Sequence, residues 1–143
     1  MGHTLLNYVG ERHGFFWWGG YGTSTEETAY WNLLNGIEPP LSGSVEQNGK
    51  ITAEQIGGQI FSDCWGLLCP GDPARAAHFA KMMSSVSHDG NGIYGGQFVA
   101  AAIASAFTSE NVEQIIESAL SVIPADCEYA LMVRDVVTQS KKK

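Results

Sequence analysis

The greatest concentration of chemically useful residues lies in a turn between two expected helices, which combines a histidine, an aspartate, a tyrosine and several glycines. Backbone N–H groups at a helix start can bind a phosphate, and an imidazole beside them can hydrogen-bond to a diphosphate or a ribose hydroxyl. The candidate ligand-binding residues of this turn are His88, Asp89, Gly90, Tyr94 and Gly95. A second interpretation is purely structural: His88 caps the carbonyl groups of one helix and Asp89 caps the next.

Two adjacent glycines, Gly57 and Gly58, form a second candidate site inside an expected helix. Together they cost the helix about 2 kcal/mol relative to alanine. We therefore expect that they allow close approach of a ligand or, equally, of another helix. The carboxylate of Asp63 follows in an apolar stretch and needs a partner there, either a ligand or a backbone N–H.

Other common catalytic patterns are missing from the sequence. The stretch 22–27 (GTSTEE) could supply oxygen ligands, but a plain helix cap explains it as well. The sequence contains no Gly-x-Ser-x-Gly, no P-loop, no C-x-x-C and no pair of carboxylates at a useful spacing. The residues alone therefore leave the catalytic groups unknown and indicate no metal ligand.

Composition limits the classes of protein that remain. The 143 residues are 44% apolar and carry a net charge of −7, which predicts one acidic domain with a real core. No basic stripe is present for nucleic acid, and no apolar run is long enough for a membrane span. The odd number of cysteines predicts free thiols and a cytoplasmic location. Only 16% of the residues are charged. We therefore expect another part of the protein, or a second copy of the chain, to cover part of the surface.

Apolar spacing, Gly and Pro stops, and the absence of period-two alternation predict an all-α fold. The expected helices cover 24–36, 52–68, 73–87, 93–107, 110–122 and 127–139. Their expected N-caps are Ser24, Thr52, Asp72, Ser109 and Asp126. We expect residues 1–143 to be a single all-helical domain: an irregular lead-in (1–23), a helical body (24–139) and a lysine tail (140–143).

The order of these motifs is specific over residues 56–107. A Gly-rich helix is followed by W-G-x-x-x-P-G-x-P, an alanine-containing helix, S-H-D-G, Y-G and an alanine-rich helix. This run resembles the ADP-ribosylglycohydrolase family. Upstream, the stretch 22–43 (GTSTEETAYWNLLNGIEPPLSG) is similar to the lead-in of a bacterial branch of that family.

The resemblance implies an orthogonal multi-helix bundle and a Mg-dependent hydrolase that cleaves N- or O-glycosidic bonds of ADP-ribose or a related nucleoside-type substrate. Its implied partner is an ADP-ribose-type small molecule or an ADP-ribosylated protein. By this likeness, Gly57 and Gly58 would lie beside the diphosphate or ribose. His88 would lie near the bound ADP-ribose, and Tyr94-Gly95 would follow it.

The sequence departs from the family pattern at its metal site. The family's two magnesium ions are held by Asp-Asp-Thr and Asp-x-Asp-Thr motifs, and neither occurs here. Glu26-Glu27 does not replace the first motif, and Asp135-Val136-Val137-Thr138 lacks the form of the second. We therefore expect an internal fragment, a partial version of the fold that is inactive alone. The alternative is a non-catalytic helical module that binds a nucleotide-sugar or a partner chain.

Overall fold

The computed structural model describes residues 1–10, 13–14 and 21–142. The α-helices are α1 (Gly2–Tyr8), α2 (Thr25–Leu34), α3 (Val45–Asn48), α4 (Lys50–Ala53), α5 (Gly57–Ile60), α6 (Asp63–Leu68), α7 (Pro73–Ser84), α8 (Gly90–Ala106), α9 (Val112–Leu120) and α10 (Glu128–Ser140). A 3₁₀ helix, η1, covers Leu41–Gly43, and β1 (Val9–Gly10) pairs antiparallel with β2 (His13–Gly14). Apart from this short pair the described fold is helical, which confirms the all-α prediction.

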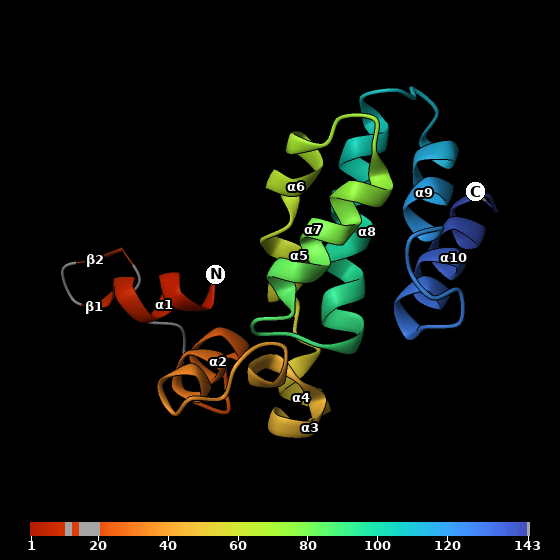
Figure 1. Cartoon of the computed structure of the whole chain (residues 1–143). Helices are drawn as coiled ribbons and strands as arrows, with labels where there is room; N and C mark the ends of the chain where they lie inside the picture. The colour runs from red at the N-terminus through yellow and green to blue at the C-terminus, as the bar shows by residue number, and fades with distance from the viewer. Residues whose placement is uncertain (11–12, 15–20, 143) are drawn as a thin grey trace.

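Helix α8 is the centre of the bundle, with α5, α6 and α7 on one side and α9 on the other (Figure 1). Its alanines Ala100, Ala101 and Ala104 are fully buried. Side chains this small let neighbouring helices approach closely, and Trp65 and Phe79 fill the space that remains beside them. An alanine-rich helix that is apolar nearly all round therefore takes the central place.

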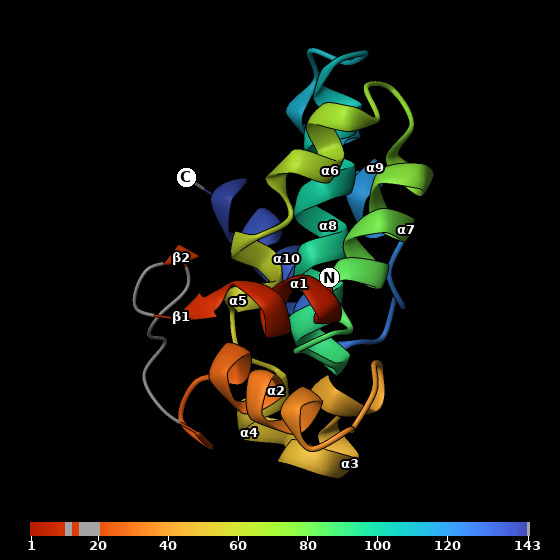
Figure 2. The same cartoon turned by 60° about the vertical axis from the view of Figure 1, so that its left-hand side comes forward.

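A second group, α2, η1, α3 and α4, lies beneath the bundle in Figure 1. Hydrogen bonds connect this group to the segment that precedes α8. The Ser42 hydroxyl donates to the carbonyl of Val86 at 2.7 Å, and the N–H of Asp89 donates to the carbonyl of Ala53 at 3.0 Å. Helix α1 lies beside the bundle and above α2 in Figure 1, and it passes in front of the lower part of the bundle in Figure 2.

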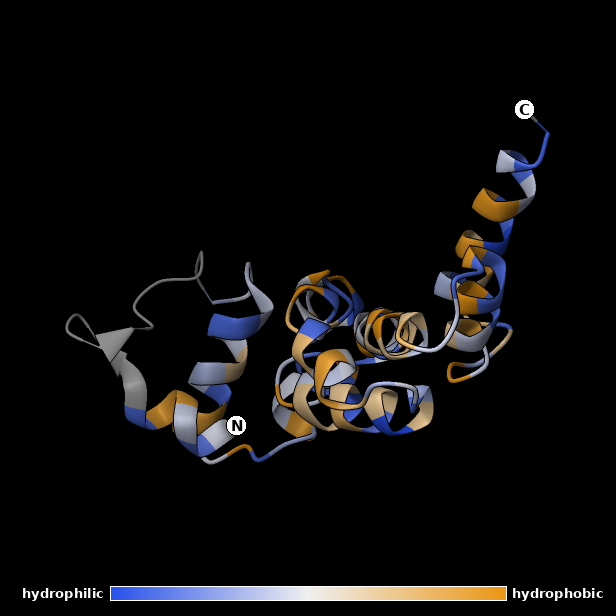
Figure 3. Cartoon of the chain, turned by 90° about the horizontal axis from the view of Figure 1, so that it is seen from above, coloured by the Kyte–Doolittle hydropathy of each residue, from blue (hydrophilic) through white to orange (hydrophobic). Residues whose placement is uncertain are grey.

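The C-terminal helices α9 and α10 pack through Leu120, Ile123 and Ala130, all buried. The outer side of α10 remains apolar in part, as the view from above in Figure 3 shows. Leu131 and Val136 are exposed there. No helix of the described residues is long and apolar enough to cross a membrane.

The expectation of an irregular lead-in over 1–23 is wrong for its first part, because Gly2–Tyr8 is helical. Met1, Thr4 and Leu5 share one helix face and line a cavity against the bundle. Tertiary contact therefore stabilises a segment too short and too poor in periodic residues for recognition from sequence. Residues 11–12 and 15–20 of the lead-in lie outside the described residues.

The single helix expected over 52–68 is also wrong, because the chain forms α4, α5 and α6 instead. Thr52 is not an N-cap but a buried residue inside α4. The break leaves its carbonyl free, and that carbonyl accepts a hydrogen bond from the Thr25 hydroxyl at 3.1 Å. The Ser62 hydroxyl likewise donates to the carbonyl of Gly58 at 2.6 Å. Side chains thus replace the lost helical bonds.

The other helix starts divide into confirmed and shifted ones. Ser24 accepts from the N–H of Glu27, and Asp72 caps α7, as predicted. The expected caps Ser109 and Asp126 are wrong by two residues and one residue, because Asn111 and Cys127 cap α9 and α10. The stretch between the first two expected helices contains η1 and α3, and α10 continues through Ser140 into the expected lysine tail.

Candidate ligand-binding site

His88 is the largest fully buried side chain of the described residues, with 1% of its surface exposed. Its Nε2 accepts a hydrogen bond from the backbone N–H of Gly58 at 3.0 Å. The proton of the neutral ring is therefore on Nδ1, which donates to the Ser87 hydroxyl at 2.7 Å. Burial lowers the pKa of His88 from 6.5 to about 4. The imidazole is neutral at pH 7 and fixes the Gly57-Gly58 segment.

The glycines at 57 and 58 are both buried, and neither position has room for a side chain. A Cβ on Gly57 would overlap the Glu26 carboxylate and approach the His88 Nε2 to 2.7 Å. A Cβ on Gly58 would overlap the carbonyl oxygen of Gly92 in α8. The sequence predicts that another group approaches these glycines closely. In the structure those groups are an imidazole, a carboxylate and the backbone of α8. Contact of these glycines with a ligand stays a prediction.

Asp89 is the N-cap of α8, as the structural interpretation of the turn expects. One carboxylate oxygen accepts from the N–H of Gly90 at 2.8 Å, and the other accepts from the N–H of Val45 at 3.0 Å. Gly90 has a φ of +49°, and the Glu54 carboxylate occupies the space that a Cβ would need. The turn therefore joins α3, α4 and α8, and it needs glycine to do so.

Tyr94 and Gly95 belong to a different neighbourhood from His88. Tyr94 packs against the buried cluster of the two C-terminal helices. A Cβ on Gly95 would meet the Gln59 amide oxygen at 3.0 Å and the Tyr129 ring at 3.1 Å. Gly95 therefore makes room for the hydrogen bond from the Tyr129 hydroxyl to Gln59 at 3.1 Å.

Asp63 does not join either group. It is exposed in the first turn of α6, so water solvates the carboxylate that seemed to need a protein partner. The structure thus brings Gly57, Gly58, His88 and Asp89 together and leaves Asp63 apart.

Glu26 lies beside this group, and it belongs to the stretch 22–27, for which the sequence allows either oxygen ligands or a plain helix cap. Its carboxylate is 3.9 Å from the His88 Nε2 and contacts Gly57. The helix cap is confirmed, because Ser24 caps α2 and Glu26 lies in the first turn of that helix. The inward direction of Glu26 depends on how α2 docks on α4, which the hydrogen bond from the Thr25 hydroxyl to the Thr52 carbonyl fixes.

Two cavities border the His88 turn. One, of about 270 Å³, lies between α1 and the bundle and reaches Glu26 and Ser87. The other, of about 280 Å³, is lined by His88, Asp89 and residues of η1 and α3. The His88 turn therefore separates the two cavities, with Ser87 lining the first and His88 lining the second.

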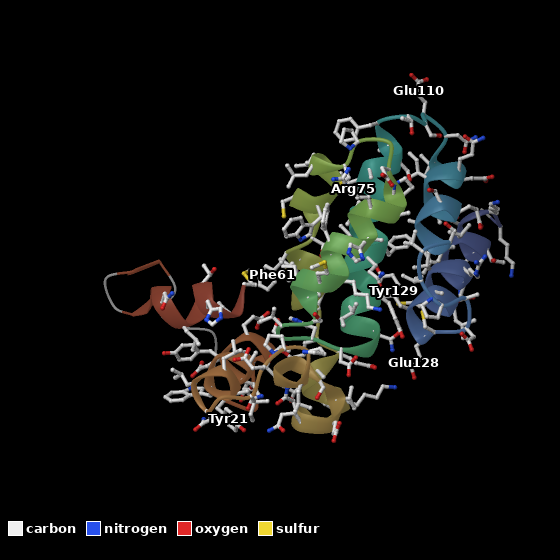
Figure 4. The ribbon with its side chains drawn as sticks, viewed as in Figure 1. Tyr21, Phe61, Arg75, Glu110, Glu128 and Tyr129 are labelled. Carbon is white, nitrogen blue, oxygen red and sulfur yellow. The ribbon has the colours of Figure 1, made fainter. Side chains whose placement is uncertain are left out.

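A polar cluster on the other side ties α10 to the rest of the fold. The Asn91 amide donates to Glu54 and to Glu128, each at 3.1 Å, and Lys50 pairs with Glu128 at 3.0 Å. Tyr129 lies between α10 and the bundle in Figure 4, and burial raises the pKa of its phenol. The polar groups of this cluster are partners of one another, and together they hold α10 in position.

Comparison with known proteins decides the family. The family model described as ADP-ribosylglycohydrolase matches residues 1–143. The chain belongs to the ADP-ribosylglycohydrolase family. No match was found among curated proteins or among solved structures. This family consists of glycohydrolases, so the chain is a glycohydrolase-like protein, and the resemblance seen over 56–107 is confirmed.

The described residues do not offer the metal site that active ADP-ribosylglycohydrolases are expected to carry. No three or more His, Cys, Asp or Glu side chains gather closely enough among them to hold an ion. Glu26 faces a neutral imidazole, and Asp89 is engaged by two backbone N–H groups. These donors do not fit a pair of magnesium ions.

Proposed function

We propose that this chain forms a ligand-facing wall of a Mg-dependent glycohydrolase that acts on N- or O-glycosidic bonds of ADP-ribose or a related nucleoside-type molecule. The family match over residues 1–143 carries the proposal. The proposed substrate is either a free ADP-ribose-type molecule or ADP-ribose attached to a protein. The proposed place of work is the cytoplasm, which agrees with the free thiols of Cys64, Cys69 and Cys127.

The geometry supports a rigid wall rather than a set of reacting groups. His88 uses Nε2 on Gly58 and Nδ1 on Ser87, so neither nitrogen is free to move a proton. In the proposed role the imidazole holds the Gly57-Gly58 segment at a fixed distance from the ligand, and the catalytic metal and its carboxylates come from motifs that this sequence lacks. The chain by itself then binds ligand without turning it over.

Calorimetry with ADP-ribose, with and without magnesium, tests this proposal when run beside a turnover assay on an ADP-ribosylated peptide. We expect ADP-ribose to bind in both conditions and no hydrolysis to occur. Hydrolysis by the isolated chain would refute the claim of inactivity, and absence of ADP-ribose binding would refute the ligand-facing wall.

A second candidate function is a non-catalytic helical module that binds a nucleotide-sugar or a partner chain. The exposed apolar side chains of α5, α6 and α10 favour it. These include Ile56, Ile60, Leu67, Leu68 and Leu131. Size-exclusion chromatography with light scattering distinguishes the two: concentration-dependent association supports the module, and a monomer at all concentrations opposes its partner-binding form.

A further inference from the structure

A cavity of about 270 Å³ lies between α1 and the bundle. Met1, Leu5, Phe61, Trp65 and Met83 give it an apolar wall. One carboxylate, that of Glu26, lines it as well. We propose that this cavity binds a small organic cation, with its apolar or aromatic body against the wall and its charged nitrogen on Glu26.

Glu26 has no lysine or arginine partner among the residues that the structure describes. Its side chain is only 19% exposed, and its nearest basic neighbour is the His88 Nε2 at 3.9 Å. That nitrogen already accepts the N–H of Gly58, so it has no proton to give. A carboxylate largely removed from water in this way gains from a donor that a ligand supplies.

The aromatic wall suits the same ligand. Indole and phenyl rings attract cations through their π faces, and both Trp65 and Phe61 line the cavity. Figure 4 shows Phe61 reaching from the end of α5 toward α1. The volume is at the lower end for small-molecule pockets and leaves room for one ring with a short side chain.

Charge separates this site from the proposed ADP-ribose wall. The chain carries a net charge of −7, so its field favours approach of cations over anions. A diphosphate inside this cavity would be repelled by the Glu26 carboxylate, so the cavity and the proposed ADP-ribose wall take different ligands. The cation site therefore does not rest on the proposed hydrolase function, and each can fail without the other.

NMR titration with benzylammonium, and with benzyl alcohol as its neutral analogue, tests the cation site. We expect benzylammonium to shift the indole N–H resonance of Trp65 and to bind about tenfold more tightly than the alcohol. Glu26→Gln should weaken benzylammonium about tenfold and leave the alcohol unchanged. Glu110→Gln is the matched control, because it removes the same charge at an exposed position far from α1 (Figure 4).

Three outcomes overturn the proposal. Equal affinity of the ammonium and the alcohol in the unmodified chain would show that Glu26 takes no part, and this comparison holds even where Glu26→Gln fails to fold. A Trp65 resonance that stays fixed while other residues shift would place the ligand elsewhere. Weakening of benzylammonium by Glu110→Gln to the same degree would mean that net charge, and not the cavity, draws the cation.

Discussion

Protonation of His88 should destabilise the fold over a defined range of pH. Its pKa is about 4 in the folded chain and 6.5 in a solvated side chain. Between these values the unfolded chain binds a proton that the folded chain does not, so the free energy of unfolding falls as pH falls. The slope reaches about 1.4 kcal/mol per pH unit. His88 should therefore remove about 3 kcal/mol between pH 6.5 and 4 and nothing above pH 7.

Urea unfolding at successive pH values measures this loss, and variants isolate it from the carboxylates that titrate in the same range. His88→Asn should be less stable at pH 7, because it loses the bond to Gly58, but its stability should fall less steeply between pH 6.5 and 4. His78→Asn replaces an exposed histidine of α7 and should reproduce the original pH curve. A slope for His88→Asn equal to that of the original chain would refute a buried, neutral His88.

Three further substitutions, one of them with a control variant, probe other contacts of the fold. Gly58→Ala should destabilise the chain by about 1–3 kcal/mol in chemical denaturation, because its Cβ overlaps the carbonyl of Gly92; an unchanged midpoint would contradict that contact. Asp89→Ala should lower the free energy of unfolding by about 1–2 kcal/mol, because α8 loses its cap. Asp126 caps no helix, so Asp126→Ala is the control and should change stability by less than about 0.5 kcal/mol. Equal losses of stability in the two variants would contradict the assigned caps. Tyr129→Phe should cost about 1 kcal/mol, and a neutral result would mean that its hydrogen bond to α5 contributes nothing.

The sequence predicts the helical class and the positions of most long helices, because apolar spacing and caps are local signals. Ser24 and Asp72 cap their helices as expected. Asn111 and Cys127 take the places expected for neighbouring residues, since several polar residues in each loop can cap and the packing of the helix decides among them.

The break between α4, α5 and α6 could not be read from spacing alone. The two glycines signal close approach, but only the folded chain shows that His88 and Gly92 are the groups that approach them. For the same reason the inward turn of Glu26 was not foreseen. Its role follows from the docking of α2, which involves residues about thirty positions away.

The two separate candidate segments did contain residues that meet in space: Gly57 and Gly58 from one, and His88 and Asp89 from the other. The sequence also grouped Tyr94 with them, although the helical rotation of α8 directs Tyr94 to the C-terminal cluster. Nearness along the chain is therefore a weaker guide than helical phase within this site.

The most direct test of the proposed ligand-facing wall is an amide NMR titration of the whole chain with ADP-ribose. We expect the largest shifts at Gly57, Gly58 and His88, with smaller shifts along α10. Saturable shifts confined to other parts of the chain, or no shifts at all, would contradict the proposal that this segment of an ADP-ribosylglycohydrolase faces the ligand.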